Sequence, residues 1–237
     1  MYKLSGRVYD ALHDQFKNYA AECKELQAIL QRYAPRAVSL LDVACGTGRH
    51  LECLREHYQV EGLDLSPELL RIARLRCTGV PFHQANMVDF DLNRCFDVII
   101  CLFSSIGYAK TLKRLQKTVA NFARHLRPGG IAVVEPWFFP ERFWTGRVVA
   151  NFVDKPELKI VWMHTSEAEG RVAILDSHYL VGTPERINHF TERYEVGLFT
   201  HRQYLEAFQK ARLEVHYDSK GLIGRGMYIG LKKQNLT

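Results

Sequence analysis

The first 140 residues change their hydrophobic period from one segment to the next. Short apolar runs of the length expected for buried strands lie at 39–44, 60–66, 81–87, 96–105 and 131–139. Longer segments in which apolar residues recur at helical spacing lie at 10–34, 49–58, 66–77 and 111–126. Strands that alternate with helices in this way predict a doubly wound α/β fold, in which helices cover both faces of a largely parallel sheet.

Residues at the ends of the segments support these boundaries. Pro35 ends the first helical segment, and the run RPGG at 127–130 ends the last one. Ser66 stands where a helix N-cap is expected, and Pro67 follows in the first turn. Both features favour a helix that begins directly after the second predicted strand.

The pattern becomes antiparallel after Pro140. Two extended runs within 158–182 flank Glu167–Arg171, which predicts a hairpin, and a third extended run covers 187–199. We therefore expect a small antiparallel β insert at 141–195, which covers the substrate site of the α/β unit. No internal repeat or low-complexity segment interrupts this organisation.

The last forty residues return to the α/β pattern. A helix is predicted at 200–213, where Thr200 and Gln203 have the spacing of a capping box. Two strands are predicted after it, at 213–219 and 226–233. The main domain is therefore expected to comprise 1–140 and 196–237, and the strands predicted for it number seven.

Composition limits the cellular setting. The chain has 237 residues, of which 47% are apolar, and no apolar run approaches the about 20 residues that span a bilayer. Its first residues lack the apolar core of a signal peptide, and its six cysteines include no CxxC pair. We expect a cytoplasmic protein with reduced thiols, no metal site and no membrane association. The net charge of +6 leaves an anionic substrate, a nucleic acid or simply a basic surface open.

A glycine loop follows the first predicted strand, in the stretch LLDVACGTGRHL at 40–51. The chain has no GxxxxGK[ST] sequence, so a P-loop is excluded. A dinucleotide fingerprint needs a third glycine where Leu51 stands, which weakens that interpretation without excluding it. A nucleotide-containing ligand such as S-adenosylmethionine also suits a strand, a glycine turn and a helix.

Polar residues at the ends of the next strands narrow the choice. Asp64 follows Gly46 by 18 residues, at the end of the second predicted strand, where a carboxylate can accept both hydroxyls of a ribose. Asn86 and Met87 end the third predicted strand, and an amide beside a thioether suits the edge and face of adenine. Ligands bind at this edge of open α/β sheets.

These motifs resemble those of a known family. DVACGTG, GLDLS and the RPGG that precedes IAVVE resemble class I S-adenosylmethionine-dependent methyltransferases. MVDF, FSSIGY, VVEPWFFPE, GLFT and GRGMYIG resemble the N-methyltransferases that convert TDP-linked amino deoxysugars to N,N-dimethyl sugars in antibiotic biosynthesis. The resemblance implies a seven-stranded Rossmann-like sheet, S-adenosylmethionine as methyl donor and a nucleotide-sugar substrate.

The resemblance also assigns roles to residues at matching positions. Residues expected to contact the cofactor are Tyr9, Tyr19, Ala44, Gly46, Asp64, Leu65, Asn86, Met87 and, through its main chain, Ser104. Residues expected to contact the nucleotide sugar are Tyr2, Trp137, Phe138 and Arg225. Tyr108 is the candidate catalytic residue, which orients the amine or accepts a proton through water. Two family positions differ, because Asp64 replaces a frequent Glu and Asn86 replaces the usual Asp.

Other interpretations stay open at this point. The acceptor could be another small metabolite, and a nucleic-acid methyltransferase or a non-catalytic cofactor-binding protein would share the fold. The motif [DN]PP[YF] of base-methylating enzymes is absent, so we expect no nucleic-acid partner. His164 and His178 of the insert either line the site or face solvent. A homodimer is a further expectation, because the edges of a small extra sheet suit pairing.

Overall fold

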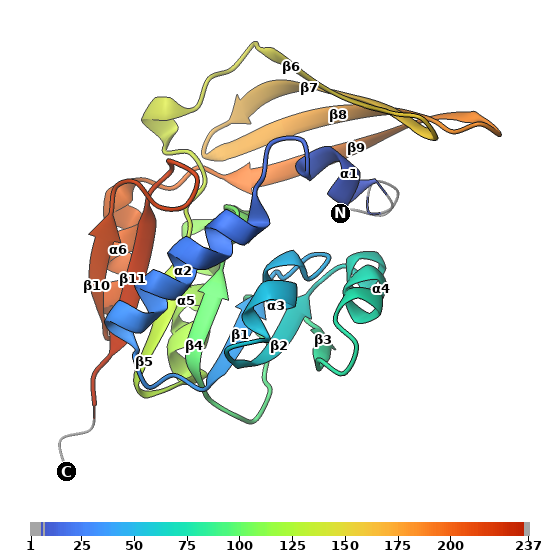
Figure 1. The fold of residues 1–237 in the computed structure, drawn as a ribbon. Helices are drawn as coiled ribbons and strands as arrows, with labels where there is room; N and C mark the ends of the chain where they lie inside the picture. The colour runs from blue at the N-terminus through green and yellow to red at the C-terminus, as the bar shows by residue number, and fades with distance from the viewer. Residues whose placement is uncertain (1–5, 7, 235–237) are drawn as a thin grey trace.

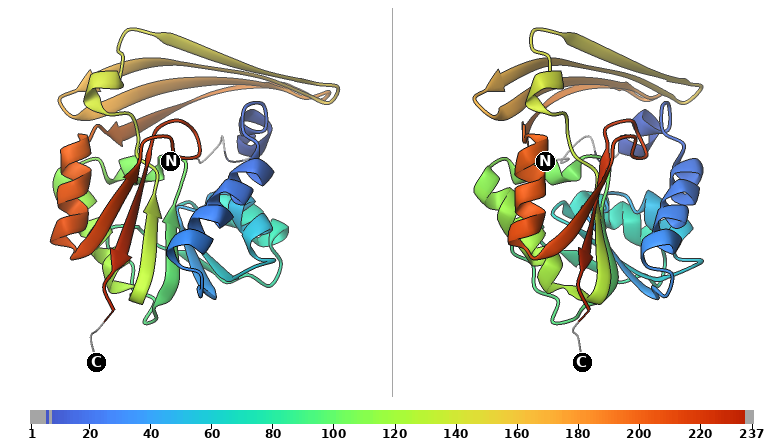
Figure 2. Two further views of the ribbon diagram at one scale, coloured as in Figure 1. Left: turned by 60° about the vertical axis from the view of Figure 1, so that its left-hand side comes forward. Right: turned by 90° about the vertical axis from the view of Figure 1, so that its left-hand side faces the viewer.

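The computed structural model describes residues 6 and 8–234 of the chain. A seven-stranded sheet flanked by helices forms the body, and a four-stranded antiparallel sheet lies across one end of it (Figure 1). The two further views agree that the second sheet caps the body (Figure 2). The α/β fold with an antiparallel β insert that the sequence predicts is confirmed.

The large sheet has the strand order β10-β11-β5-β4-β1-β2-β3. Its strands are β1 (Ser39–Val43), β2 (Gln59–Asp64), β3 (Phe82–Gln84), β4 (Phe96–Cys101), β5 (Leu126–Val134), β10 (Leu213–Asp218) and β11 (Met227–Lys232). Strands β1 to β5 pair in parallel, whereas β11 pairs antiparallel with both β5 and β10. The carboxyl ends of the five parallel strands therefore share one edge, which faces the second sheet.

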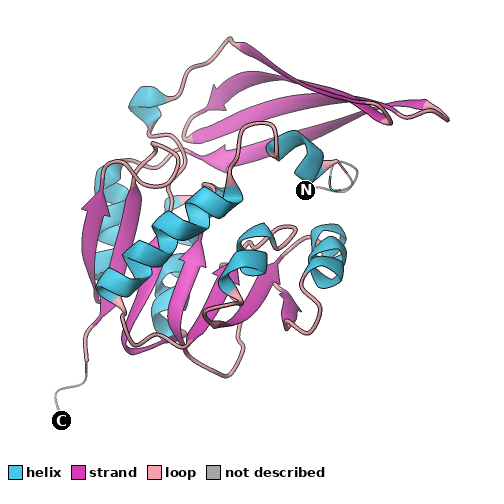
Figure 3. Cartoon of the chain, viewed as in Figure 1, coloured by secondary structure: helices cyan, strands magenta, loops and turns pink. Residues whose placement is uncertain are grey.

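Helices cover both faces of this sheet (Figure 3). They are α2 (Tyr19–Tyr33), α3 (Arg49–Leu54), α4 (Pro67–Arg76), α5 (Leu112–Arg124) and α6 (His201–Lys210). An apolar core lies on each face of the sheet, and successive residues of β4 point into opposite cores. Ile99 packs with α5 and α6 on one face, and Ile100 packs with α2 and α3 on the other. Strands buried on both faces explain the nearly continuous apolar runs of the sequence.

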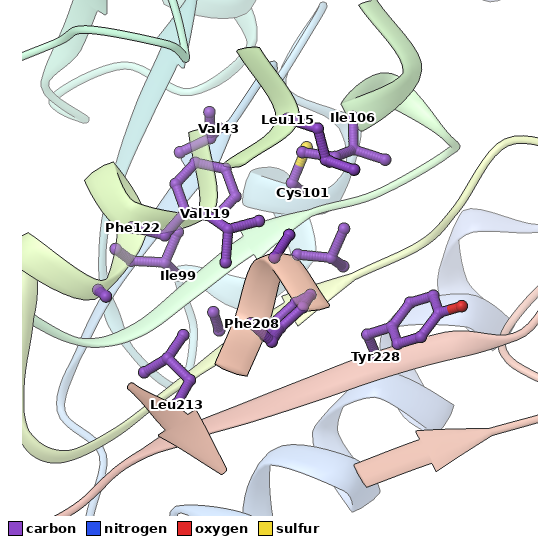
Figure 4. Packing of buried hydrophobic residues seen from close by; sticks show 14 of the residues in the cluster. Val43, Ile99, Cys101, Ile106, Leu115, Val119, Phe122, Phe208, Leu213 and Tyr228 are labelled. Atoms are coloured by element: carbon purple, nitrogen blue, oxygen red, sulfur yellow. The ribbon is translucent and has the colours of Figure 1, made fainter. Parts of the chain in front are cut away.

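The core on the α5 and α6 side is dominated by large side chains (Figure 4). Phe122 of α5 and Phe208 of α6 are fully buried there, together with Tyr228 of β11. Burial of side chains of this size stabilises the fold by about 1.5–3 kcal/mol each. The body is thus a rigid support for the loops at its carboxyl edge.

The second sheet consists of β6 (Val148–Lys155), β7 (Leu158–Glu169), β8 (Val172–Gly182) and β9 (Ile187–Gly197). Neighbouring strands are consecutive and antiparallel. The hairpin predicted at Glu167–Arg171 joins β7 to β8, whereas β6 has no counterpart in the sequence prediction. The sheet lies within the predicted insert to within a few residues, and the division into two domains stays a prediction.

The N-terminal segment differs from its prediction. One helix is expected over 10–34, but the structure has a short helix α1 (Tyr9–His13) and then α2. Asn18 begins the second helix, because its side chain caps the amide of Ala21 at 3.0 Å. The two helices also serve different partners: α1 packs Leu12 under the antiparallel sheet, and α2 packs Leu26 on the large sheet.

Two other boundaries shift. The strand predicted at 131–139 begins earlier, at Leu126, so that the run RPGG lies within β5, where its pairing with β4 shifts register. The third strand is shorter than predicted, and Asn86 and Met87 follow β3 in a loop instead of ending the strand. The helix caps at Ser66 and at Thr200 with Gln203 are confirmed.

Candidate active site

Two hollows meet where the body faces the antiparallel sheet. The first, here called the sheet-edge pocket, measures about 370 Å³ and lies over the carboxyl ends of the parallel strands. Predicted residues that line it are Tyr9, Ala44, Gly46, Asp64, Leu65, Asn86, Met87 and Tyr108. A small side chamber adjoins it and is bordered by Tyr19 and Asp42. The structure thus brings together most of the residues that the resemblance assigns to the cofactor.

The second hollow, here called the covered cavity, measures about 390 Å³ and lies beneath the antiparallel sheet. Predicted residues that line it are Tyr9, Ser104, Tyr108, Trp137, Phe138 and Arg225. His164 also lines it, whereas His178 lies at a separate groove of the insert. Tyr2 lies outside the described residues.

Four residues form a wall that the two hollows share. They are Tyr9 of α1, Ser105 and Tyr108 of the 3₁₀ segment η2 (Ser105–Ala109), and Tyr194 of β9. These residues come from three distant parts of the chain, so that only the folded arrangement makes them neighbours. A group bound in one hollow can meet a group bound in the other at this wall.

The glycine loop adopts left-handed backbone conformations. Gly46 has φ 57° and Ala44 has φ 61°, which is unusual for a residue with a side chain. A Cβ atom on Gly46 would meet no protein atom within 4 Å, so the space over this glycine is open to a ligand. A Cβ on Gly48 would lie 3.2 Å from that of Ala73, so this glycine lets α3 and α4 pack closely.

Asp64 ties the loop to the end of β2. Its carboxylate accepts hydrogen bonds from the amides of Gly46 at 2.9 Å and Ser66 at 2.8 Å. Burial raises the pKa of Asp64, and the amides oppose that shift. Each oxygen keeps a lone pair beyond these bonds, so that the carboxylate can also accept hydroxyl groups from the pocket.

Asp42, at the end of β1, is a functional candidate that the sequence prediction did not assign. Its side chain is buried, and Oδ2 has no hydrogen-bond partner among the described residues. Burial raises the pKa of Asp42, and the charge of Asp64 adds to the shift. A buried carboxylate oxygen without a partner fits a ligand that brings a cation or a donor into the side chamber.

Asn86 and Met87, the residues expected near adenine, line the sheet-edge pocket. The Asn86 side-chain oxygen accepts a hydrogen bond from the amide of Val88 at 3.0 Å and shapes the turn. Its NH₂ group therefore has the donor role toward the pocket. Strand β9 adds Arg193 and Glu195 to the lining of this pocket, and Glu195 pairs with Lys110, the residue after η2, at 2.7 Å.

Helix α1 is fastened to the glycine loop by a network that sequence reasoning missed. Asp10 accepts a hydrogen bond from Thr47 Oγ1 at 2.6 Å and pairs with Arg76 of α4 at 2.6 Å. Arg76 also donates to the Thr47 carbonyl at 2.5 Å, and Arg49 pairs with Asp14. These contacts hold Tyr9 at the wall between the hollows, and they join residues 66 positions apart.

The covered cavity is walled largely by aromatic rings. Arg225 lies 4.7 Å from the Trp137 ring and 4.4 Å from the Phe138 ring, and it donates to Ser104 Oγ at 2.9 Å. Burial lowers the pKa of Arg225, and Glu135 partly offsets this. Among the described residues that line the cavity there is no Asp or Glu. A buried guanidinium on aromatic walls suits an anionic group carried by an apolar ligand.

Ser104, which is expected to contact the cofactor, does not line the sheet-edge pocket. Its Oγ donates to the carbonyl of Pro136 at 2.7 Å, and the residue lines the covered cavity but not the sheet-edge pocket. Its neighbour Ser105 borders both hollows. Phe103 and Ser104 have positive φ angles, and Glu135 steadies this strained pair by accepting from the Phe103 amide at 2.7 Å.

Within the part of the chain that the structure describes, no helix combines the length and apolar content that crossing a membrane requires. The described residues also contain no group of three or more acidic, histidine or cysteine side chains that could hold a metal ion. All six cysteines, which lie in the described ranges, are free.

The chain is similar to known methyltransferases. A family of methyltransferase domains matches residues 40–130. The chain is 42% identical, over 95% of its length and 90% of the relative's, to the dTDP-3-amino-3,6-dideoxy-alpha-D-glucopyranose N,N-dimethyltransferase of Streptomyces fradiae.

Solved structures agree with this. Streptomyces venezuelae DesVI is 39% identical, with a TM-score of 0.91 over 97% of this chain and 98% of that one. CalS10, an amino pentose methyltransferase from Micromonospora echinaspora solved with bound S-adenosylmethionine, is 34% identical, with a TM-score of 0.86 over 98% of both chains.

Proposed function

This chain belongs to the family of S-adenosylmethionine-dependent N-methyltransferases of dTDP-linked amino deoxysugars, and we propose that it converts the amine of such a sugar to its N,N-dimethyl form. One observation carries the proposal beyond family membership. A pocket suited to the cofactor and an aromatic cavity suited to a sugar nucleotide share a wall of four residues. Transfer between two bound molecules requires that arrangement.

The sheet-edge pocket fits S-adenosylmethionine. Asp64 would accept the ribose hydroxyls, and the loop from Ala44 to Gly46 would offer its main chain to the methionine part, beside Tyr9 and Tyr19. The partnerless oxygen of buried Asp42 supports an ammonium group in the side chamber, because a cation there would relieve the cost of the buried carboxylate. When bound, the cofactor supplies a methyl group on a cationic sulfur.

The other predicted contacts complete the cofactor proposal. Leu65, Asn86 and Met87 would enclose the adenine, since they line the same pocket beyond Asp64. The main-chain contact expected of Ser104 stays a prediction. A cofactor bound in this order along the edge would present its reactive end toward the shared wall.

The covered cavity suits the sugar nucleotide. Arg225 would bind the diphosphate, because its guanidinium is held in place by two aromatic rings and a serine hydroxyl. Trp137 and Phe138 would contact the apolar faces of the deoxysugar. The contact predicted for Tyr2 belongs to the proposal but lies outside the described residues.

The reaction requires little chemistry from side chains. An amine with its own lone pair attacks the methyl carbon directly, so that alignment of the two molecules can supply about 7–11 kcal/mol of the barrier. Tyr108 borders both hollows and would orient the amine or relay its proton to water. The chain therefore acts mainly by positioning the acceptor and by excluding water.

Three broader expectations belong to the same proposal. Exposed apolar residues on the antiparallel sheet, which include Phe152, Met163 and Ile187, support a homodimer. Six free cysteines support a cytoplasmic location. The antiparallel sheet over the covered cavity supports a division into a cofactor domain at 1–140 and 196–237 and an insert at 141–195.

The direct test is incubation of the purified protein with S-adenosylmethionine and a panel of acceptors. The panel should include dTDP-3-amino and dTDP-4-amino deoxysugars, a matching dTDP-sugar with a hydroxyl, and a small RNA. We expect mono- and dimethylated amino sugars by mass spectrometry and no product from the hydroxyl sugar or the RNA. Turnover of the RNA alone, or of no amino sugar, would refute the proposal.

A further inference from the structure

His13, at the end of α1, borders the covered cavity. It belongs to none of the sequence motifs described above. Its Nδ1 lies 2.7 Å from the carbonyl oxygen of Tyr9. A carbonyl oxygen can only accept, so Nδ1 carries the hydrogen and Nε2 carries a lone pair. None of the hydrogen bonds found among the described residues uses Nε2.

The imidazole ring is held firmly beside the shared wall. It stacks on the ring of Tyr9 at 4.0 Å and meets Phe103 edge-on at 5.3 Å and Trp162 at 6.3 Å. Tyr9 is itself part of the wall, so His13 lies next to the place where the two hollows meet. A ring fixed by these contacts and by its own helix has little freedom to turn.

His13 is a neutral acceptor at physiological pH. Burial lowers its pKa to about 4, and Lys17 adds to the shift, whereas the bond to the Tyr9 carbonyl and the charges of Asp10 and Asp14 oppose it. An uncharged acceptor can hold an N–H group while stabilising an ammonium group much less than a carboxylate would.

The rest of the cavity is consistent with that role. Among its described lining residues Arg225 is the only lysine or arginine, and none is acidic. Burial without a counter-charge disfavours an ammonium group, so a sugar amine bound here is held in its neutral, nucleophilic form. A carboxylate in place of His13 would stabilise the unreactive ammonium.

We propose that Nε2 of His13 accepts a hydrogen bond from the acceptor amine and thereby directs the nitrogen lone pair toward the shared wall. The inference rests on the proposed function, since it names a further residue that touches the amino sugar. His13 would be a catalytic residue by contact, and it is not the final acceptor of the proton.

The chemistry balances without any further reactant. The nitrogen lone pair forms the new N–C bond, the C–S bond breaks with its electron pair left on sulfur, and nitrogen becomes cationic. One proton then leaves nitrogen for water, which restores the lone pair for the second transfer. The hydrogen bond to His13 strengthens as charge builds on nitrogen, so it stabilises the transition state more than the ground state.

The second transfer depends on His13 more than the first. A primary amine offers two N–H groups and can find another acceptor, such as the Tyr108 hydroxyl. In a monomethylated amine the methyl group takes the place of the second N–H group. Losing His13 then removes the only contact that directs the remaining N–H group away from the shared wall. A defect at His13 should therefore cause the monomethyl sugar to accumulate.

The test uses H13F, which keeps a flat ring without an acceptor, and H13Q, whose amide oxygen can replace Nε2. H125F is the matched control, because His125 is also buried and also bonds through Nδ1 to the carbonyl four residues earlier, but it lines neither hollow. For each protein we would measure the kcat of both methyl transfers with a dTDP-amino sugar. Binding of S-adenosylhomocysteine by calorimetry would report whether the fold and the cofactor pocket remain intact.

We expect H13F to lower kcat by about 10- to 100-fold with monomethyl product accumulating, because a hydrogen bond to a charged group is lost. H13Q should recover part of this activity. The kcat of H125F and the cofactor affinity of every variant should change by less than about three-fold. An H13F enzyme with parental rates, or equal losses in H13F and H13Q, would overturn the inference. Failure of the parent protein to methylate any amino sugar would instead refute the proposed function.

Discussion

The two hollows touch at one wall but have opposite chemistry. The sheet-edge pocket and its side chamber contain two buried carboxylates, Asp42 and Asp64, at the ends of adjacent strands. The covered cavity has aromatic walls, one arginine and, among its described lining residues, no carboxylate. The difference matches what each ligand needs. A cationic donor is stabilised by nearby negative charge, whereas an amine that must attack has to stay unprotonated.

The largest effect is expected when a carboxylate is removed from the sheet-edge pocket, where the methyl donor is proposed to bind. D64N should weaken S-adenosylhomocysteine binding by about 100-fold, because charge-assisted bonds to the ribose are lost. Affinity for the sugar nucleotide should hardly change. Calorimetry with each ligand separately measures both effects.

E61Q provides the matched control for D64N. Glu61 is a second buried carboxylate of β2, but it pairs with His83 and Arg94 and lines neither hollow. Its replacement should cost stability without a selective loss of cofactor affinity. Equal losses in both variants would show that Asp64 acts only through the fold.

A smaller effect is expected when the positive charge of Arg225 is removed from the covered cavity, where the sugar nucleotide is proposed to bind. R225A should raise the KM for a dTDP-amino sugar by about 30-fold, because a charge-assisted contact with the diphosphate is lost. Steady-state kinetics at saturating S-adenosylmethionine measures this change. R147A is the control, since Arg147 also stacks on an aromatic ring, that of Trp144, but does not line the cavity.

Loosening α1 should affect both sides at once. R76Q removes the pairing with Asp10 and the bond to Thr47, so Tyr9 loses its support at the wall. We expect kcat/KM to fall by about 10-fold for both substrates, consistent with a partly buried ion pair. R71Q on the same helix breaks only an exposed pair with Glu68 and should have no such effect. A loss confined to one substrate would contradict this function of α1.

The smallest expected effect concerns acid stability. The folded pKa of His13 is about 4 and its ordinary value is 6.5, so at intermediate pH the unfolded chain binds a proton that the folded chain does not. Stability from this residue is therefore lost as pH falls from about 6.5 toward about 4, by on the order of 1 kcal/mol in the first unit.

H13F should remove that part of the pH dependence. Denaturant unfolding at two pH values would compare its slope with that of the parent. His50 and His164, whose pKa values burial also lowers, contribute equally to both proteins. If the unfolding free energy of H13F changes with pH as steeply as that of the parent, His13 titrates normally. The covered cavity would then be more hydrated than the structure indicates.

Local patterns predicted most of the fold because the strands are buried on both faces and the helices carry clear caps. The apolar run of β4 around Ile99 and the helix caps at Ser66 and Thr200 each depend on a few neighbouring residues. A local sequence pattern is therefore enough to predict them. Strand β6 escaped prediction because its exposed face carries apolar residues such as Val148 and Phe152, which obscure a period of two. The break before Asn18 depends on α1 packing beneath the other sheet, which no local pattern records.

The candidate site was predictable where residues follow successive parallel strands or match motifs of the resembled family. Gly46 and Asp64 follow strands whose order is regular, so their meeting could be expected. Asp10 and Arg76, or His13 and Phe103, meet through tertiary contacts, and their residue types are common on ordinary surfaces. A single signal pointed to them in retrospect: Tyr9, Asp10 and His13 share one short helix that precedes the first strand.

The shared wall also has a consequence for engineering. Tyr9, Ser105, Tyr108 and Tyr194 each serve two chambers, so redesign at these positions would disturb donor affinity together with acceptor choice. Trp137, Phe138 and Asn151 touch the covered cavity alone. Libraries aimed at new sugars should vary those three first, since a change there leaves methyl-donor recognition intact.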